Sequence, residues 1–255
     1  MRQFLAAYRL QIQSVRANPD YLLTLATIPL FSIVMLSIVK NAGRDDLIVN
    51  ALLGPVLMGL WGISLNQAGE VIATDRNAGV LEAVLAAPCR FPILVAGRVF
   101  AVTSLGLLTF IEVGLVATLV FRISIEVAHP FLFAAGLFIT AAAMSGSALL
   151  MAAIFSYGRG SRPFQRALSY PFYVLGGVVV PVSFLPEAVQ PLTKVIFLSW
   201  SSDLLRDSIS LAAVPDPAAR MGVILLLGAA ASVGGWWSIL KVMRRVRARG
   251  TMSYV

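Results

Sequence analysis

Long uncharged apolar runs alternate with short polar stretches along most of this chain. The first run, residues 21–39, would form a helix about 28 Å long, close to the roughly 30 Å of a bilayer's hydrocarbon core. Five more apolar runs lie at 47–69, within 91–121, within 130–158, at 167–186 and at 221–240, and only the one within 91–121 is interrupted by charged residues. The pattern predicts an all-α, polytopic membrane protein with six transmembrane helices, in which residues 21–243 form one transmembrane domain.

Residues 1–20, before the first run, have the pattern of an amphipathic helix. The apolar and basic positions fall on different helix faces: Phe4, Tyr8, Ile12 and Val15 against Arg2, Arg9 and Arg16. Such a helix lies at the membrane surface, where its apolar side chains dip between lipids and its arginines meet anionic headgroups. The run that follows is too long for a signal peptide and has no cleavage site after it. We therefore predict an N-terminal interfacial helix that ends at Asn18-Pro19.

A polar segment, residues 69–92, separates the second and third runs. Val71, Ala78, Leu81 and Leu85 follow helical spacing, so the segment would have one apolar side and one charged side. The glycine of Asn77-Ala78-Gly79 suits a turn, which predicts two short helices hinged there. Two interpretations are open: a solvated loop whose charges only orient the protein in the membrane, and a docking element for a cytosolic partner.

The stretch before the last run, residues 187–205, contains prolines and apolar patches too short to cross a bilayer. We predict short external helices, either re-entrant or interfacial, since irregular backbone at membrane depth needs protein or water around it. After the last run, residues 244–255 are predicted to form a basic cytoplasmic tail.

Charge predicts the orientation of the six spans. The chain has 20 Lys and Arg residues and a net charge of +8. Fourteen of the 20 fall on the side that holds both termini, so the positive-inside rule places the termini and residues 69–92 in the cytoplasm of a cell-membrane protein. The loop with Arg159, Arg162 and Arg166 is predicted on the same side. The basic residues flank apolar runs and no nucleic-acid-binding motif surrounds them, so nucleic acid is not an expected partner.

The composition excludes several classes of function. Hydrophobic residues make up 58% and charged residues 13% of the chain, against roughly 25% charged in soluble domains. One cysteine and one histidine cannot build a disulfide framework or a Cys/His metal cluster within one chain. None of the lysines lies in a phosphate-binding loop, and no nucleophile elbow is present. We therefore expect no catalytic, metal or cofactor site in this chain.

Two charged residues fall inside the third run. Glu112 lies deep in it, and an intramembrane carboxylate suggests either a substrate pathway or a buried hydrogen bond between helices. Arg98 lies near its start, and we expect its long side chain to extend to the cytoplasmic face.

The polar segment carries a family resemblance. The series Arg76-x-x-Gly79-x-Leu81-Glu82-x-x-Leu85-x-x-Pro88, followed by Gly97-Arg98, resembles the cytoplasmic signature of the type 2 class of ABC exporter permeases. The later run of Gly176-Gly177, Pro181, Leu185-Pro186 and Leu204-Leu205-Arg206 resembles the same family's fifth-span and external region. Two departures are Arg98, where the family often has Lys, and Leu198-Ser199-Trp200, where a turn with proline is common.

The resemblance implies a division of labour. Residues 70–88 would be a coupling helix that docks on a separate ABC ATPase, which binds ATP and Mg. Two ATPase copies would drive two permeases, as a homodimer or with a related permease. The implied docking residues are Glu70, Asp75, Arg76, Gly79, Leu81, Glu82 and Pro88, with Arg159, Arg162 and Arg166 as a second contact.

The resemblance implies export, and spans almost free of charge suit an amphiphilic or hydrophobic substrate, such as a drug, antibiotic or natural product. A lipid or glycan exporter of the same class is the first alternative. An ATP-independent transporter or channel is the second, although the chain shows no internal repeat of the kind such proteins carry.

Overall fold

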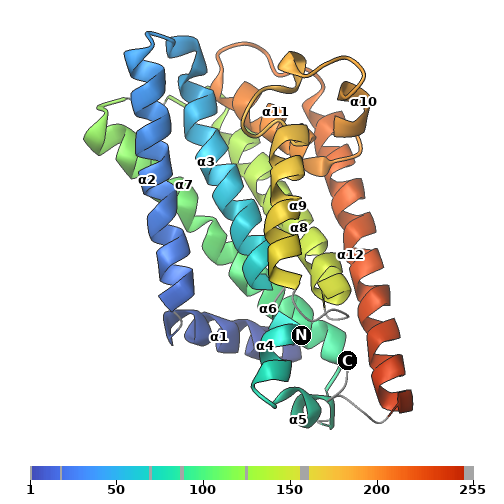
Figure 1. The fold of residues 1–255 in the computed structure, drawn as a ribbon. Helices are drawn as coiled ribbons and strands as arrows, with labels where there is room; N and C mark the ends of the chain where they lie inside the picture. The colour runs from blue at the N-terminus through green and yellow to red at the C-terminus, as the bar shows by residue number, and fades with distance from the viewer. Residues whose placement is uncertain are drawn as a thin grey trace.

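The protein is a bundle of helices in the computed structural model, which describes residues 2–17, 19–68, 71–86, 89–123, 126–155 and 161–249. These residues contain helices and turns and no strand, which confirms the all-α prediction. Long helices run side by side along the bundle, and short helices lie at its two ends (Figure 1).

The first half of the chain forms α1 (Arg2–Ala17), α2 (Pro19–Asn41), the 3-10 helix η1 (Asp45–Leu47), α3 (Ile48–Gly62), the π-helical η2 (Ile63–Ala68), α4 (Val71–Asn77), α5 (Leu81–Ala86), α6 (Phe91–Gly106), α7 (Leu108–Leu115) and the π-helical η3 (Val116–Val120). The second half forms α8 (Pro130–Phe155), α9 (Ser161–Leu175), the 3-10 helix η4 (Val182–Phe184), α10 (Gln190–Thr193), α11 (Phe197–Ile209) and α12 (Pro217–Arg249). Helix α1 ends before Asn18-Pro19, as predicted.

Four helical stretches in the described part of the chain are long and apolar enough to cross a membrane. They are Asp45–Leu65, Phe91–Val120, Pro130–Phe155 and Pro217–Arg244. These correspond to the second, third, fourth and sixth predicted runs, while Leu25–Asn41 within α2 is a shorter apolar helix. The membrane-protein prediction is supported, and the count of six spanning helices is not confirmed.

The predicted fifth span, residues 167–186, is not one continuous helix. Helix α9 has 15 residues and ends at Leu175, so it is about 22 Å long, short of the roughly 30 Å hydrocarbon core. Gly177 then takes a φ of +63°, a conformation that glycine adopts without the strain of a side chain, and the chain leaves the helix there. The adjacent glycines therefore end the helix within an apolar run that hydropathy alone reads as unbroken.

Helices α8 and α12 form a seam of small residues along their length. A Cβ on Gly228 of α12 would lie 2.6 Å from Cα of Ala143 on α8, and one on Gly235 would lie 2.6 Å from the backbone nitrogen of Leu150. Glycines seven positions apart on α12 thus let the two backbones approach closely, the usual way in which helices pack where lipid replaces water.

The segment predicted as short external helices contains α10 and α11. Helix α11 packs into the core, where Leu198, Leu204 and Leu205 are fully buried near the stacked rings of Trp61 and Phe172, whose centroids are 4.7 Å apart. These short helices lie at the end of the bundle opposite α1, α4 and α5 (Figure 1). Whether they re-enter a membrane stays a prediction.

Candidate functional site

The polar segment between α3 and α6 folds into two short helices, α4 and α5, joined by a tight turn. The backbone N–H of Ala78 donates to the carbonyl of Thr74, and that of Val80 donates to the carbonyl of Asp75, each at 3.0 Å. Gly79 has a φ of +68°, which glycine adopts without a Cβ penalty. The predicted pair of helices hinged at this glycine is therefore confirmed.

One side of this helical hairpin is anchored in the bundle. Val71, Ile72 and Leu81 are at most 7% exposed, and Ile72 and Leu81 belong to a core cluster that includes Val95 and Val99 of α6. Ala78, Gly79 and Val80 at the turn are exposed. The hairpin thus presents its turn outward while its apolar side fixes it to α6.

Helix α1 lies directly against α6 next to this hairpin. A Cβ on Gly97 would lie 2.7 Å from the carbonyl oxygen of Phe4, so the absence of a side chain permits this close approach. The Tyr8 and Ser104 hydroxyls are hydrogen-bonded at 2.9 Å, and the Phe4 and Phe100 rings are 5.9 Å apart. These contacts are spread along both helices, so α1 and α6 pack together as one unit.

Arg98 joins the three elements α1, α4 and α6. Its Nε donates a hydrogen bond to Oε1 of Gln11 on α1 at 2.8 Å, and its Nη1 donates to Oδ2 of Asp75 on α4. The Arg98 side chain is 9% exposed and that of Asp75 15%. We call this arrangement of Gln11, Asp75 and Arg98 the junction.

The expectation that Arg98 extends to a membrane face is wrong. Helices α1 and α4 cover the guanidinium, so its charge meets a carboxylate and an amide oxygen inside the protein rather than water. Removing one partner of a buried ion pair typically costs about 3–5 kcal/mol, because the remaining charge is left uncompensated. The junction therefore ties the polar hairpin to α6 through a contact that is costly to break.

The other residues predicted for docking have different places. Gly79 forms the exposed turn and Leu81 is buried. Arg76 and Glu82 belong to α4 and α5, but their side chains lie outside the described part of the structure, as do Glu70 and Pro88 altogether. The docking role of this set stays a prediction.

The residues predicted for a second contact lie at the start of α9. Arg162 and Arg166 are in its first half, although their side chains are not described, and Arg159 falls outside the described residues. Their contact with a partner stays a prediction.

Glu112 is separate from the junction. It lies on α7, 14 positions after Arg98, which corresponds to about 21 Å along a continuous helical rise. Its Oε2 is buried without a hydrogen-bond partner among the described residues. An unpaired buried carboxylate oxygen is costly, so Glu112 stays the candidate for a polar step along a pathway.

Sequence reasoning missed Gln11 and the role of Gly97. Gln11 is three positions after Tyr8 and four before Val15, so it lies on the apolar face of α1, and it is only 3% exposed. A polar residue within an apolar helical stripe signals a buried partner. The signal for Gly97 was its place immediately before an arginine inside an apolar run.

Comparison with known proteins gives one family. The model of the family described as ABC-2 type transporter matches residues 2–209. The match runs from α1 through α11 and so contains the whole junction. No curated protein matches the chain.

Proposed function

Since this chain belongs to the ABC-2 type transporter family and is the membrane permease part of such a transporter, we propose that it exports an amphiphilic or hydrophobic substrate. The energy would come from a separate ABC ATPase. Permeases of this family lack the ATP-binding domain and generally pair with such an ATPase. The proposed docking element is the hairpin of α4 and α5, through which movement of the ATPase reaches the membrane helices.

The junction is the observation that carries this proposal. A docking element can do mechanical work only if it cannot slip relative to the helices it must move. Asp75 of the hairpin is bonded to Arg98 of α6, which also holds α1 through Gln11. A force applied to α4 would therefore displace α1 and α6 together rather than bend the hairpin.

The element that precedes the hairpin in the chain makes a second contact with α6. Helix η2, which precedes it in the chain, meets α6 through a hydrogen bond from the Ser64 hydroxyl to that of Thr103 at 3.3 Å. Beyond a break at Leu107, α6 leads into α7, which carries Glu112. Movement of α6 would thus reposition a carboxylate in the middle of the proposed pathway.

We propose that both termini and the hairpin face the cytoplasm and that two permeases, identical or related, work with two ATPase copies. The apolar lining expected from nearly uncharged spans supports an amphiphilic cargo such as a drug, antibiotic or natural product. The hairpin, α1 and the C-terminal end of α12 lie at the same end of the molecule, as this arrangement requires (Figure 1).

Sidedness provides the first test. The chain has a single cysteine, so Ala78→Cys in a Cys89→Ser background places one thiol on the exposed turn. A membrane-impermeant maleimide is expected to label it in inside-out vesicles and not in right-side-out vesicles. Labelling from the outside would overturn the docking role of the hairpin.

Reconstitution provides the second test. The permease and its cognate ABC ATPase in liposomes are expected to move an amphiphilic dye only when ATP is present. A matched control carries an ATPase variant that binds ATP without hydrolysing it. Dye movement that persists without ATP would instead identify an ATP-independent transporter or channel.

A further inference from the structure

The third apolar span is interrupted near its middle. The backbone N–H of Leu107 donates to the carbonyl of Ser104, and that of Phe110 donates to the carbonyl of Leu107, each at 3.2 Å. These are 3-10 steps between α6, which ends at Gly106, and α7. The Thr109 hydroxyl donates to the carbonyl of Gly106 at 2.7 Å and so satisfies a group that the break frees. A short 3-10 stretch inside a helix often marks a hinge.

The second span changes its backbone at the same level. A Cβ on Gly106 would lie 2.7 Å from Cδ1 of Leu60 and 3.8 Å from Cγ2 of Ile63, where α3 gives way to the π-helical η2. A π-helical turn is another common site of bending in a helix. The Tyr173 hydroxyl of α9 donates to the carbonyl of Met58 at 3.2 Å, just before this change. Two adjacent spans are therefore irregular where they touch.

Two further helices carry a proline at this level. Residues 58–63 of α3 and η2 contact α2 at Ile28 and α9 at Phe172. Ile28 immediately precedes Pro29, which lies inside α2. Phe172 immediately follows Pro171, which lies inside α9. A proline inside a helix removes a backbone hydrogen bond and weakens the helix there. We call residues 58–63 and the three breaks that touch them the hinge layer.

The two halves of the third span pack against different neighbours. On the hairpin side of the hinge layer, α6 packs mainly against α1, η2 and α8, and Arg98 joins it to α4. On the other side, α7 packs against α2 and α3. The hydrogen bonds of Thr103 to Ser64 and of Ser104 to Tyr8 lie just before the break. The hinge layer thus separates two groups of helices.

Helices α8 and α12 pass the hinge layer without a break. Helix α8 packs against α11 at one end of the bundle and against η2 and α4 toward the other. Neither helix has an internal proline. In the core that α8 shares with α6, its side chains are small, namely Ala148, Ala152 and Ala153. Small side chains form shallow ridges, which hinder sliding of one helix on another little.

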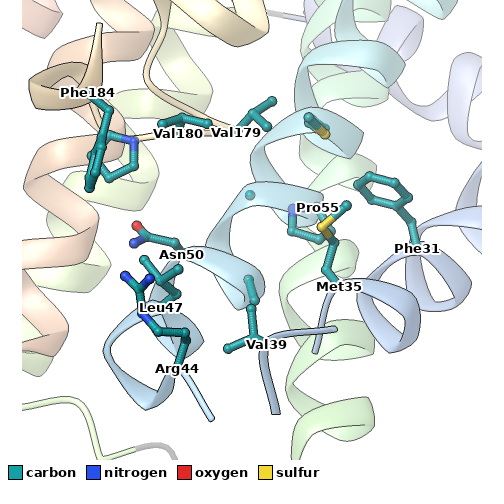
Figure 2. A pocket seen from close by; sticks show the side chains of 14 residues that line it. Phe31, Met35, Val39, Arg44, Leu47, Asn50, Pro55, Val179, Val180 and Phe184 are labelled. Atoms are coloured by element: carbon teal, nitrogen blue, oxygen red, sulfur yellow. The ribbon is translucent and has the colours of Figure 1, made fainter. Parts of the chain in front are cut away.

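A groove of about 270 Å³ borders the hinge layer between α2 and α3 (Figure 2). Phe31 and Met35 of α2 line it with Pro55 and Met58 of α3. Close-packed protein interiors resist a change in helix angle, and free volume beside a helix removes that resistance. Helix α2 can therefore bend at Pro29 without compressing the core.

We propose that the ATPase moves the hairpin side of the bundle as one body about the hinge layer, a movement that presupposes the function proposed above. The hairpin, α1, η2 and α6 tilt against α8 and α12, while α7 stays packed on α2 and α3. The angle between α6 and α7 changes, and with it the position of Glu112 relative to α6. Bending at existing breaks costs few backbone hydrogen bonds, whereas bending a regular helix would cost several.

Distances between spin labels within one permease test this movement. Two cysteine pairs are introduced separately in a Cys89→Ser background: Arg90→Cys with Lys241→Cys on the hairpin side, and Leu115→Cys with Leu226→Cys on the other side. All four residues are exposed. Labelled permease is mixed with an excess of unlabelled copies and bound to its cognate ATPase in nanodiscs. The ATPase variant that binds ATP without hydrolysing it holds the complex in one state.

A tilt of about 10° over the roughly 24 Å of helix between Arg90 and Gly106 displaces the far end by about 4 Å. We expect ATP to change the distance from Arg90 to Lys241 by about this amount and to leave the distance from Leu115 to Leu226 unchanged. Equal changes in both pairs would show that whole helices tilt and would overturn the hinge. Unchanged distances would overturn the hinge alone if the unmodified complex still moves dye with ATP, and the proposed function as well if it does not.

Stiffened variants connect the hinge layer to transport. Pro29→Ala restores a backbone N–H to α2, and Gly106→Ala favours a regular helix, with a Cβ that would press mainly on the end of the Leu60 side chain. We expect the double variant to bind the ATPase normally and to move at least about fivefold less dye for each ATP hydrolysed.

The matched control combines Pro217→Ala and Gly114→Ala. Pro217 is the first residue of α12, where a backbone N–H has no helical acceptor, and a Cβ on Gly114 of α7 would meet nothing within 4 Å. Equal transport per ATP in the stiffened and control variants would overturn the hinge. The distance measurements leave the hinge residues unmodified, so they decide the matter even if the stiffened variant folds poorly.

Discussion

Replacing Arg98 by methionine is expected to leave a carboxylate and an amide oxygen without their donor inside the protein. Asp75 is 15% exposed, so water restores only part of its solvation. Losing one partner of a buried pair costs about 3–5 kcal/mol, and we place this site at the lower end, about 3 kcal/mol in the free energy of unfolding. Methionine retains most of the apolar packing of the arginine stem, so the loss reports mainly on the charge.

A double-mutant cycle isolates the ion pair. The free energy of unfolding is measured by SDS titration in mixed micelles for the unmodified protein, Arg98→Met, Asp75→Asn and the double variant. The double variant is expected to be less destabilised than the sum of the single variants by about 2 kcal/mol, because the second substitution removes the stranded charge. Arg98→Lys should be intermediate, since an ammonium lacks the fork that reaches Gln11 and Asp75 together.

The surface pair of Arg44 and Asp46 is the matched control. Its side chains are 54% and 60% exposed, so Arg44→Met should change the free energy of unfolding little. Additive effects at Arg98 and Asp75, within about 0.5 kcal/mol, would refute the junction as a mechanical link. The same result would follow if Arg98→Met behaved like the surface control.

Three further changes test other parts of the molecule. Arg76→Ala or Glu82→Ala should leave membrane insertion intact and weaken association with the ATPase by about 1–3 kcal/mol in pull-down titrations, whereas unchanged association would remove that side chain from docking. Gly97→Leu should push α1 away from α6 and expose it to protease, with an unchanged digestion pattern contradicting the observed packing. Gly228→Val should destabilise the α8–α12 seam by about 1–3 kcal/mol, while Gly222→Val, whose Cβ would meet nothing within 4 Å, should cost far less; equal effects would argue against the seam.

Local patterns were sufficient for several elements of the fold. Helix α1 and its end before Asn18-Pro19 followed from amphipathic spacing and a helix-breaking dipeptide. The hairpin of α4 and α5 followed from Gly79, because a positive φ is a property of one residue and needs no tertiary contact. Each of these features depends on interactions between residues close together in the chain.

Continuity of the apolar runs was a less reliable guide. Hydropathy records whether lipid or protein interior can surround a segment, but not whether its backbone stays helical. The run at 167–186 is apolar throughout, yet α9 ends at Leu175 and Gly177 turns the chain. Hydropathy therefore identified the chain as a membrane protein, but it did not predict where each helix ends.

By itself, the sequence determined that the chain is a helical membrane protein and that a polar hairpin interrupts its apolar runs. It also showed a resemblance to a permease that has no ATP site. Tertiary structure alone decided that Arg98 is buried between Gln11 and Asp75, positions 87 and 23 residues away along the chain. The physical reason is that a long basic side chain has two ways to satisfy its charge, through contact with water or with a carboxylate. Only the packing of α1 and α4 over α6 closes the first route and leaves the second.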